Sequence, residues 1–191
     1  MSTAAIVVDV QNDFTEGGSL AVLGGAGVAA AITAHLRAGS YDHVVATRDH
    51  HIAPGTHFAT EPDYVKTWPA HCVVGTGGVE LHPDLDRSLL EAVFDKGEYA
   101  AAYSGFEGRG PGGVSLADWL RDAGVHAVEV MGLTTDFCVV TTALDAVREG
   151  FATTVLLDLT AGVGAQTTAT ALDRLEAAGI TLHGTPVLAT R

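Results

Sequence analysis

The chain contains six short runs of apolar residues, separated by stretches in which polar residues and glycine are frequent. The first two runs are apolar without alternation, which is typical of strands buried on both faces of a parallel sheet. We therefore expect six strands, each followed by a turn or a loop. They lie at residues 4–8, 43–47, 89–94, 125–131, 153–157 and 180–183.

Stretches between these runs predict helices. Ser115 is a suitable N-cap for one of them, and Gly150 and Gly179 are suitable terminating glycines for two others. The helices are expected at residues 28–37, 115–121, 138–148 and 167–178. Strands that alternate with helices imply right-handed crossovers and a parallel sheet between two helix layers. The predicted fold class is α/β, with three α-β-α layers around a six-stranded parallel sheet.

Length and charge narrow the class of protein. A chain of 191 residues suits one core, and without a repeat or linker we expect residues 1–191 to form a single domain. The net charge of −13 disfavours nucleic acid and anionic membrane surfaces as partners. The N-terminus lacks a basic region, no apolar run approaches the ~20 residues of a membrane span, and only Cys72 and Cys138 are cysteines. We expect a cytoplasmic protein with reduced thiols.

Three residues with reactive side chains lie at or just beyond predicted strand ends, namely Asp9, Lys96 and Cys138. Because parallel strands share one C-terminal edge, these residues can meet in one crevice. Cys138 at the first turn of a helix would be favoured as a thiolate nucleophile. Asp9 would act as its base, Lys96 would pair with both anions, and backbone N–H groups of residues 132–138 would hold an oxyanion. The structural alternative is a surface ion pair for Lys96 and simple packing for Cys138.

A second cluster predicts a metal site in a long loop rich in proline and glycine. Asp49, His51, His57 and His71 are ligand types for Zn²⁺, Mn²⁺ or Fe²⁺, and His50 is a rival to its neighbour His51. Four of the nine histidines lie between positions 50 and 71, although histidines scattered over the surface remain the alternative. A metal ion held by three histidines and one aspartate, with coordination positions left open, would bind substrate or take part in catalysis.

These residues occur together in motifs that resemble the bacterial nicotinamidase/pyrazinamidase family of the isochorismatase-like cysteine hydrolase superfamily. The resemblance covers nearly the whole chain and implies a Rossmann-like six-stranded parallel sheet flanked by helices. The sequence alone leaves two interpretations of Trp68, a pocket wall and a packing anchor. The motifs are Val8-Asp9-Val10-Gln11-Asn12-Asp13-Phe14, Asp49-His50-His51 through His57-Phe58, Trp68-Pro69-Ala70-His71-Cys72-Val73, Lys96-Gly97, Tyr103-Ser104-Gly105-Phe106 and the stretch from Gly132 to Cys138.

The resemblance implies a role for each matching residue. Asp9, Lys96 and Cys138 would form the catalytic triad, and Asp49, His51, His57 and His71 would bind one divalent ion (Zn, Fe or Mn). Phe14, Trp68, Tyr103, Ser104 and Leu133 would surround the substrate. A cis peptide between Leu133 and Thr134 would aim the N–H of Thr134, with that of Cys138, at the oxyanion.

The implied reaction is hydrolysis of nicotinamide to nicotinate and ammonia through a Cys138 thioester, in NAD salvage, with pyrazinamide as a further substrate. The partner is thus a small molecule, and the protein is expected as a monomer or small homo-oligomer. His50 departs from the family, many members of which have an aromatic residue there. A different carboxamide or ureido amidase and a metal-binding or ligand-binding protein without turnover are the alternatives.

Overall fold

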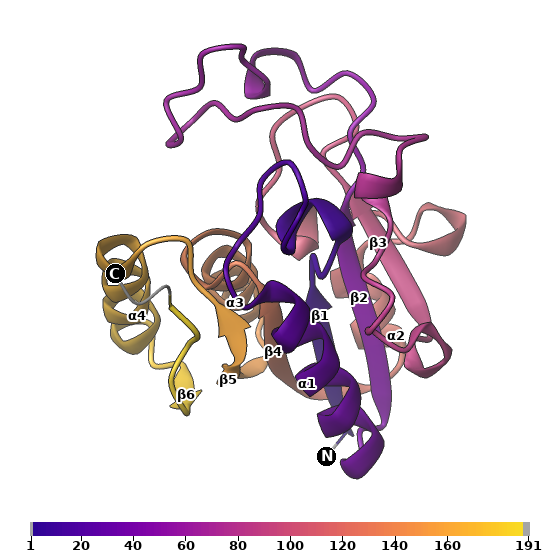
Figure 1. Ribbon diagram of the computed structural model, residues 1–191. Coiled ribbons are helices and arrows are strands. Elements are labelled where there is room, and N and C mark those ends of the chain that lie inside the picture. Colours follow the sequence, from indigo (N-terminus) through magenta and orange to yellow (C-terminus); the bar gives the residue numbers. More distant parts are fainter. Residues whose placement is uncertain (1, 189–191) are drawn as a thin grey trace.

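A computed structural model describes residues 2–188 and contains a six-stranded parallel sheet with the strand order β3-β2-β1-β4-β5-β6 (Figure 1). The predicted fold class is confirmed. The strands are β1 (Ser2–Val8), β2 (His43–Asp49), β3 (Ala92–Lys96), β4 (Val125–Leu133), β5 (Ala152–Ala161) and β6 (Thr181–His183). The helices are α1 (Gly25–Ala38), α2 (Leu116–Asp122), α3 (Val140–Arg148) and α4 (Ala165–Ala177).

Both faces of the sheet are buried, and β1 shows this most clearly. Alternate side chains of a strand point to opposite faces. Ile6 packs in a core with residues of α2, α3 and α4, whereas its neighbour Val7 packs in a second core with residues of α1. The two cores explain why the strands read as apolar runs without alternation.

The strand order reverses between β1 and β4, since later strands are added on one side of β1 and then on the other. Open α/β sheets bind ligands in the crevice outside the C-terminal ends of the strands at such a point. The segment between β2 and β3 has only short 3-10 turns as regular structure, and it rises above this end of the sheet in Figure 1. The fold therefore brings the long loop to the place where a ligand site is expected.

Several predicted boundaries were wrong, among them the end of the fifth strand, which runs to Ala161 and not residue 157, and the start of the first helix at Gly25 and not residue 28. Two further differences have a clear physical reason. The third strand begins at Ala92 and not at residue 89, because Leu89 ends a 3-10 turn in which the side chain of Asp86 accepts a hydrogen bond from Ser88 N–H. This local capping competes with extended structure. The fourth strand runs on to Leu133, and the following helix begins as a π-helical turn, Thr135–Val139, so helical structure starts three residues before the predicted Cys138.

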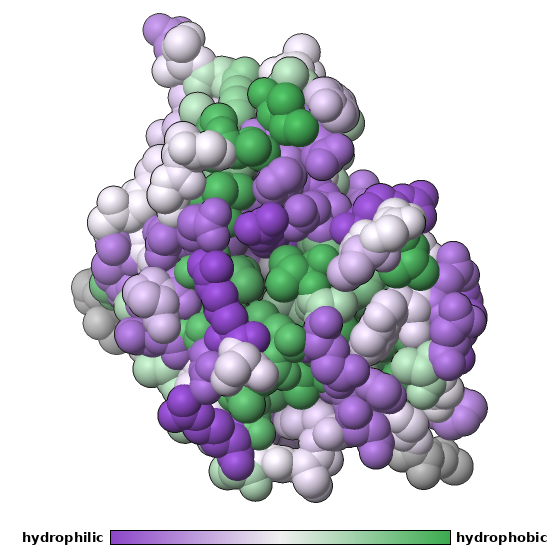
Figure 2. Space-filling model, turned by 90° about the vertical axis from the view of Figure 1, so that its right-hand side faces the viewer, coloured by the Kyte–Doolittle hydropathy of each residue, from purple (hydrophilic) through white to green (hydrophobic). Residues whose placement is uncertain are grey.

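Apolar and polar residues are mixed on the surface. The face on the right-hand side of Figure 1 has apolar surface near its centre with polar residues around it (Figure 2). Exposed apolar surface of this kind is normal for folded proteins. None of the helices within residues 2–188 combines the length and apolar character that a membrane-spanning helix needs.

Candidate active site

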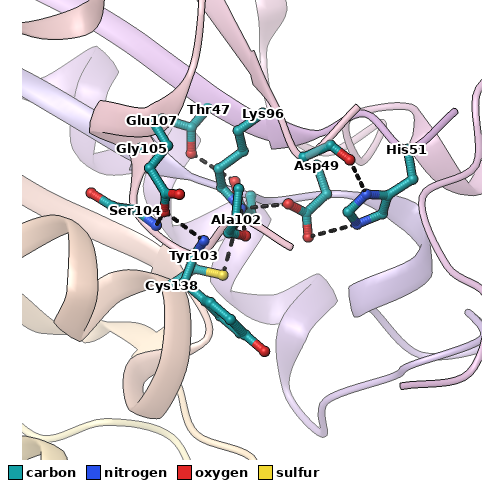
Figure 3. Close-up of polar contacts among 12 residues, drawn as sticks. Thr47, Asp49, His51, Lys96, Ala102, Tyr103, Ser104, Gly105, Glu107 and Cys138 are labelled. Atoms are coloured by element: carbon teal, nitrogen blue, oxygen red, sulfur yellow. Dashed lines mark hydrogen bonds and ion pairs between the residues drawn. The ribbon is translucent and has the colours of Figure 1, made fainter. Parts of the chain in front are cut away.

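Asp9, Lys96 and Cys138 meet at the C-terminal edge of the sheet. Asp9 directly follows β1, Lys96 is the last residue of β3, and Cys138 lies in the π-helical turn after β4. The Nζ atom of Lys96 lies 2.9 Å from Asp9 Oδ2. It lies 3.7 Å from Cys138 Sγ (Figure 3). All three side chains are buried. A carboxylate, an ammonium and a thiol thus share one crevice, as the spacing of the strand ends predicts.

Further contacts hold this group in place. Thr47 Oγ1 donates a hydrogen bond of 2.7 Å to Asp9 Oδ1. Each oxygen of the Asp9 carboxylate therefore contacts a different group, Oδ1 the Thr47 hydroxyl and Oδ2 the Lys96 ammonium. Lys96 also donates to Asp49 Oδ1 at 2.5 Å and to the carbonyl of Ala102 at 3.2 Å (Figure 3). A buried ammonium is stable only when anions and acceptors surround it, and this one is surrounded.

The electrostatics of the group decide where its proton resides. Burial raises the pKa of Asp9, and Lys96 only partly opposes this. Burial alone would lower the pKa of Lys96, but Asp49 and Asp9 hold it well above its usual range. Burial raises the pKa of Cys138 well above that of a free thiol; the Lys96 ammonium opposes this, and the nearby carboxylates of Asp9 and Asp49 raise the pKa further.

The expectation that the start of the helix favours the thiolate is therefore wrong for the resting protein. Cys138 lies inside a π-helical turn and is buried, and this desolvation raises the pKa of its thiol. The thiol keeps its proton at rest and needs an acceptor when it reacts. Asp9, whose own pKa is raised, is placed to take that proton.

Three histidines form a second group beside the first. His51, His57 and His71 are buried and each offers a ligand atom, all of them within 4.8 Å of one another. Asp49 Oδ2 lies 3.7 Å from Nε2 of both His51 and His71. Asp49 therefore connects the two groups, since its other oxygen contacts Lys96.

The hydrogen bonds of these histidines fit a bound divalent metal. His51 Nδ1 donates to the Gly97 carbonyl at 2.6 Å and His71 Nδ1 donates to the Pro69 carbonyl at 2.7 Å, which leaves each Nε2 without a proton and free to bind a metal. His51 Nε2 and His57 Nδ1 are buried without a hydrogen-bond partner. An unpaired buried nitrogen is costly, and a metal ion is the partner that such a donor set accepts.

The protonation states of Asp49 and His57 also fit a bound metal ion. Burial alone would raise the pKa of Asp49, but the neighbouring Lys96 ammonium lowers it well below its usual range. Burial, His71 and His51 lower the pKa of His57 to about 4. At neutral pH the set thus contains an ionised carboxylate and a neutral His57, the forms that metal binding requires.

The rivalry between His50 and His51 is resolved by the backbone. Both follow β2, and neighbouring side chains of an extended segment point in opposite directions. His51 joins the histidine group, whereas His50 Nδ1 lies 3.4 Å from Glu98 Oε1 and 3.8 Å from Asp95 Oδ2. His50 is therefore outside the candidate metal site.

One cavity of about 390 Å³ joins the two groups. Cys138 lies on its wall, as do Asp49, His57 and His71, while most of the remaining lining is apolar. Trp68 Nε1 donates to the hydroxyl of Tyr103 at 3.1 Å. The predicted residues Phe14, Trp68, Tyr103 and Thr134 all line the cavity. Its size and lining suit a small aromatic ligand.

Two predicted substrate residues lie behind the lining. Ser104 is buried and caps the 3-10 turn Gly105–Glu107, where its hydroxyl accepts a hydrogen bond from Phe106 N–H. Leu133 is fully buried in the core, and the predicted cis peptide between Leu133 and Thr134 is present. Both residues support the neighbours that reach the cavity, Tyr103 and Thr134.

The sequence did not point to several other lining residues. Leu20, Val22 and Val163 come from loops whose apolar residues follow no motif, and their contribution arises only when the chain folds. Phe137 also lines the cavity and packs edge-on against Trp68, with ring centroids 5.0 Å apart. Its place beside Cys138 in the sequence was the one available signal.

Known proteins are similar to this chain in sequence and in fold. Residues 3–186 match the isochorismatase domain family. The nicotinamidase/pyrazinamidase of Mycobacterium tuberculosis (strain ATCC 25618 / H37Rv) is 58% identical over 180 residues, which cover 94% of this chain and 97% of that protein.

Solved structures agree with the sequence match. The pyrazinamidase of Pyrococcus horikoshii in complex with zinc has a TM-score of 0.79 and 35% identity, and the match covers 95% of this chain and 98% of that one. The PnC1 protein from L. infantum in complex with nicotinate has a TM-score of 0.85 and 35% identity, with 98% of this chain and 96% of that one covered. The chain therefore belongs to the isochorismatase family, within the branch of the nicotinamidases/pyrazinamidases.

Proposed function

We propose that this protein is a metal-dependent nicotinamidase that hydrolyses nicotinamide to nicotinate and ammonia, accepts pyrazinamide as well, and serves NAD salvage. One observation carries the proposal: the buried thiol of Cys138 and the His57–His71–Asp49 group open into the same largely apolar cavity. A small aromatic ring with a carboxamide fits such a cavity, because the ring can face the histidines while the carboxamide faces the thiol. The named relatives support the choice of substrate.

The first half of the proposed reaction forms a thioester. Asp9 takes the proton of the Cys138 thiol, and the thiolate sulfur bonds to the carboxamide carbon. The N–H groups of Thr134 and Cys138 hold the oxygen that becomes negative, and the ammonium of Lys96 stabilises the anions beside it. Asp9 then returns the proton to the amide nitrogen, the carbon–nitrogen bond breaks and ammonia leaves.

The second half releases the acid. Asp9 takes a proton from a water molecule, whose oxygen bonds to the thioester carbon. The carbon–sulfur bond then breaks, nicotinate leaves and the thiolate of Cys138 recovers its proton. The raised pKa of Asp9 supports this double role, because a carboxylate with a raised pKa is both a better base and an acid that ionises closer to neutrality.

Asp49, His51, His57 and His71 would hold the metal, and Phe14, Trp68 and Tyr103 would hold the ring of the substrate. When bound, the ion would act as a Lewis acid that orients and polarises the ring. We propose Zn²⁺, with Fe²⁺ and Mn²⁺ as the other ions that suit an aspartate and three histidines. The zinc in the related pyrazinamidase supports this order.

Other properties of the protein stay predictions. A cytoplasmic location is supported by Cys72 and Cys138, which are both unpaired. The division into one domain is supported by the single sheet that all six strands share. The protein is still expected as a monomer or small homo-oligomer.

The test is ammonia release from nicotinamide, pyrazinamide and a ureido compound, with and without a chelator, alongside elemental analysis. We expect release from the two aromatic carboxamides, loss of most of it with the chelator, and about one bound divalent ion per chain. Release from the ureido compound alone would assign the protein to a different amidase activity. A protein that binds metal and releases no ammonia would be a binding protein, and the proposal would be wrong.

A further inference from the structure

Gln11 and Asp13 are two of the three polar residues between Asp9 and Phe14, none of which takes part in the proposed reaction. Both side chains reach across the molecule to segments that are distant in sequence and that carry the candidate metal ligands. From these contacts we propose that Gln11 and Asp13 are positioning residues that set the geometry of the metal site. The inference rests on the metal site of the proposed function.

Gln11 holds the backbone of Asp49 from both sides of the residue. Its Nε2 donates to the Asp49 carbonyl at 2.8 Å, and its Oε1 accepts from Asp49 N–H at 2.8 Å. The second N–H of the same amide goes to the Val79 carbonyl at 2.8 Å. Gln11 is fully buried, so this amide has neither freedom to turn nor water to compete with its contacts. The position of the Asp49 carboxylate between Lys96 and the histidines depends on this backbone.

Asp13 does the same for the segment that carries His71. Its Oδ2 accepts from Cys72 N–H at 2.7 Å, and Cys72 has a φ of 47°, a left-handed conformation that needs outside support in a residue other than glycine. The Cys72 carbonyl in turn accepts from His51 N–H at 3.0 Å. One hydrogen-bonded path therefore runs from Asp13 through Cys72 to the backbone of His51.

The site that holds Asp13 is built closely around it. A Cβ atom placed on Gly78 would lie 2.0 Å from Asp13 Oδ2 and 2.5 Å from Oδ1. The missing side chain of Gly78 thus leaves room for this carboxylate, and an alanine there would push it away from Cys72. The residue between the two positioning residues behaves differently, since Asn12 Nδ2 donates to the Gly77 carbonyl on the exposed side of the turn. Asn12 is therefore a matched control within the same segment.

The zinc dissociation constant of the metal-free protein tests the proposal, measured by competition with a chelator of known affinity. Loss of groups that orient metal ligands weakens affinity by about 10–100-fold in other proteins. We expect this loss for Gln11→Leu, Asp13→Ala and Gly78→Ala. Asp13→Asn keeps an oxygen acceptor for Cys72 N–H and gives up the longer contact, 3.2 Å, of Oδ1 with the exposed Ser19 N–H. This variant and Asn12→Ala should stay within about threefold of the wild type.

Circular dichroism and the melting temperature of each metal-free variant show whether it has folded. If Gln11→Leu does not fold, the two variants at Asp13, whose side chain is only partly buried, still decide the question. Folded Asp13→Ala with wild-type zinc affinity would overturn the proposal, and so would an equal loss in Asn12→Ala. Absence of zinc binding by the wild type would instead contradict the metal site itself, so the two failures are distinct.

Discussion

At the scale of single residues, the chemistry of the site depends on which side chain receives the proton of Cys138. The thiol is buried and lies 3.7 Å from the Lys96 ammonium. Lys96 already carries its proton, because two carboxylates hold its pKa well above the usual range. We therefore propose Asp9 as the proton acceptor of the group and Lys96 as the charge that stabilises both anions.

Cys138→Ala should therefore lower turnover of nicotinamide by at least about 10⁴-fold, as loss of the nucleophile does in other hydrolases. Bound metal should not change, because Cys138 lies outside the histidine group. Cys72→Ala is the matched control, since Cys72 is also a buried free cysteine but does not line the cavity. Steady-state kinetics and elemental analysis check both points. Near-normal turnover in Cys138→Ala would remove the residue from the mechanism.

The raised pKa of Asp9 predicts the acid side of the pH–rate profile. Asp9 must be ionised to act as a base, so kcat/KM should fall as the pH drops through its pKa, which lies above the value of about 3.9 for an ordinary aspartate. No fall is expected between pH 7 and pH 8, because the pKa of Cys138 lies well above that of a free thiol. Metal content measured at each pH separates this effect from metal loss. A profile that stays flat to pH 4 would contradict the role of Asp9.

Residues that follow an apolar run were predictable from the sequence, and those that act through long-range packing were not. The ends of the strands identify all three reactive residues, Asp9, Lys96 and Cys138. Thr47 gave no comparable signal, because its hydrogen bond to Asp9 exists only when β1 and β2 pair. The choice between His50 and His51 likewise required the direction of each side chain.

At the scale of elements, hydrogen bonds to Asp136 hold the π-helical turn that carries Cys138 in place. Asp136 accepts hydrogen bonds from Val163 N–H at 3.1 Å, from Gly164 N–H at 3.2 Å and from Thr167 Oγ1 at 2.5 Å. These groups belong to the loop after β5 and to the first turn of α4. The sequence predicted a helix near Cys138 but not this turn, because periodicity does not reveal contacts with a later element.

The packing of β4 against β1 predicts a large effect at Gly132. Gly132 has a φ of 121°, and an added Cβ would lie 2.1 Å from the Val8 carbonyl oxygen. Gly124 also has a positive φ, 69°, but an added Cβ there meets nothing within 4 Å. Gly124→Ala should cost about 1–2 kcal/mol from backbone strain alone. Gly132→Ala should cost clearly more, because β1 and β4 must also move apart.

Urea unfolding of both alanine variants checks this difference in the free energy of unfolding. Gly132→Ala should also lower kcat, because Asp9 and Cys138 follow these two strands. Gly124 lies at the other end of β4, so its variant should keep the wild-type kcat. Equal destabilisation by the two substitutions would mean that the close approach of the strands contributes nothing.

At the scale of the whole molecule, the long segment between β2 and β3 is joined to the sheet through the candidate metal site. Residues 50–91 include only short 3-10 turns, yet His57 and His71 come from this segment, and Asp49 is the last residue of β2. Composition and proline content predicted that the segment is a functional loop. Its path across the sheet edge depends on backbone contacts such as Val74 N–H to the His51 carbonyl, which no sequence pattern shows.

Metal removal should therefore lower the stability of the entire protein. An ion at 100 times its dissociation constant stabilises the folded state by about 2.7 kcal/mol, which raises the melting temperature of a domain of this size by roughly 5–11 °C. Calorimetry with and without a chelator should show a shift of this order. His57→Ala should bind less metal and lose most of the shift, because the site then has two histidines in place of three. A second variant, His50→Ala, should keep the full shift, since His50 faces Asp95 and Glu98. If the chelator lowers the melting temperature of His57→Ala and of the wild type equally, the ion that stabilises the fold is bound elsewhere.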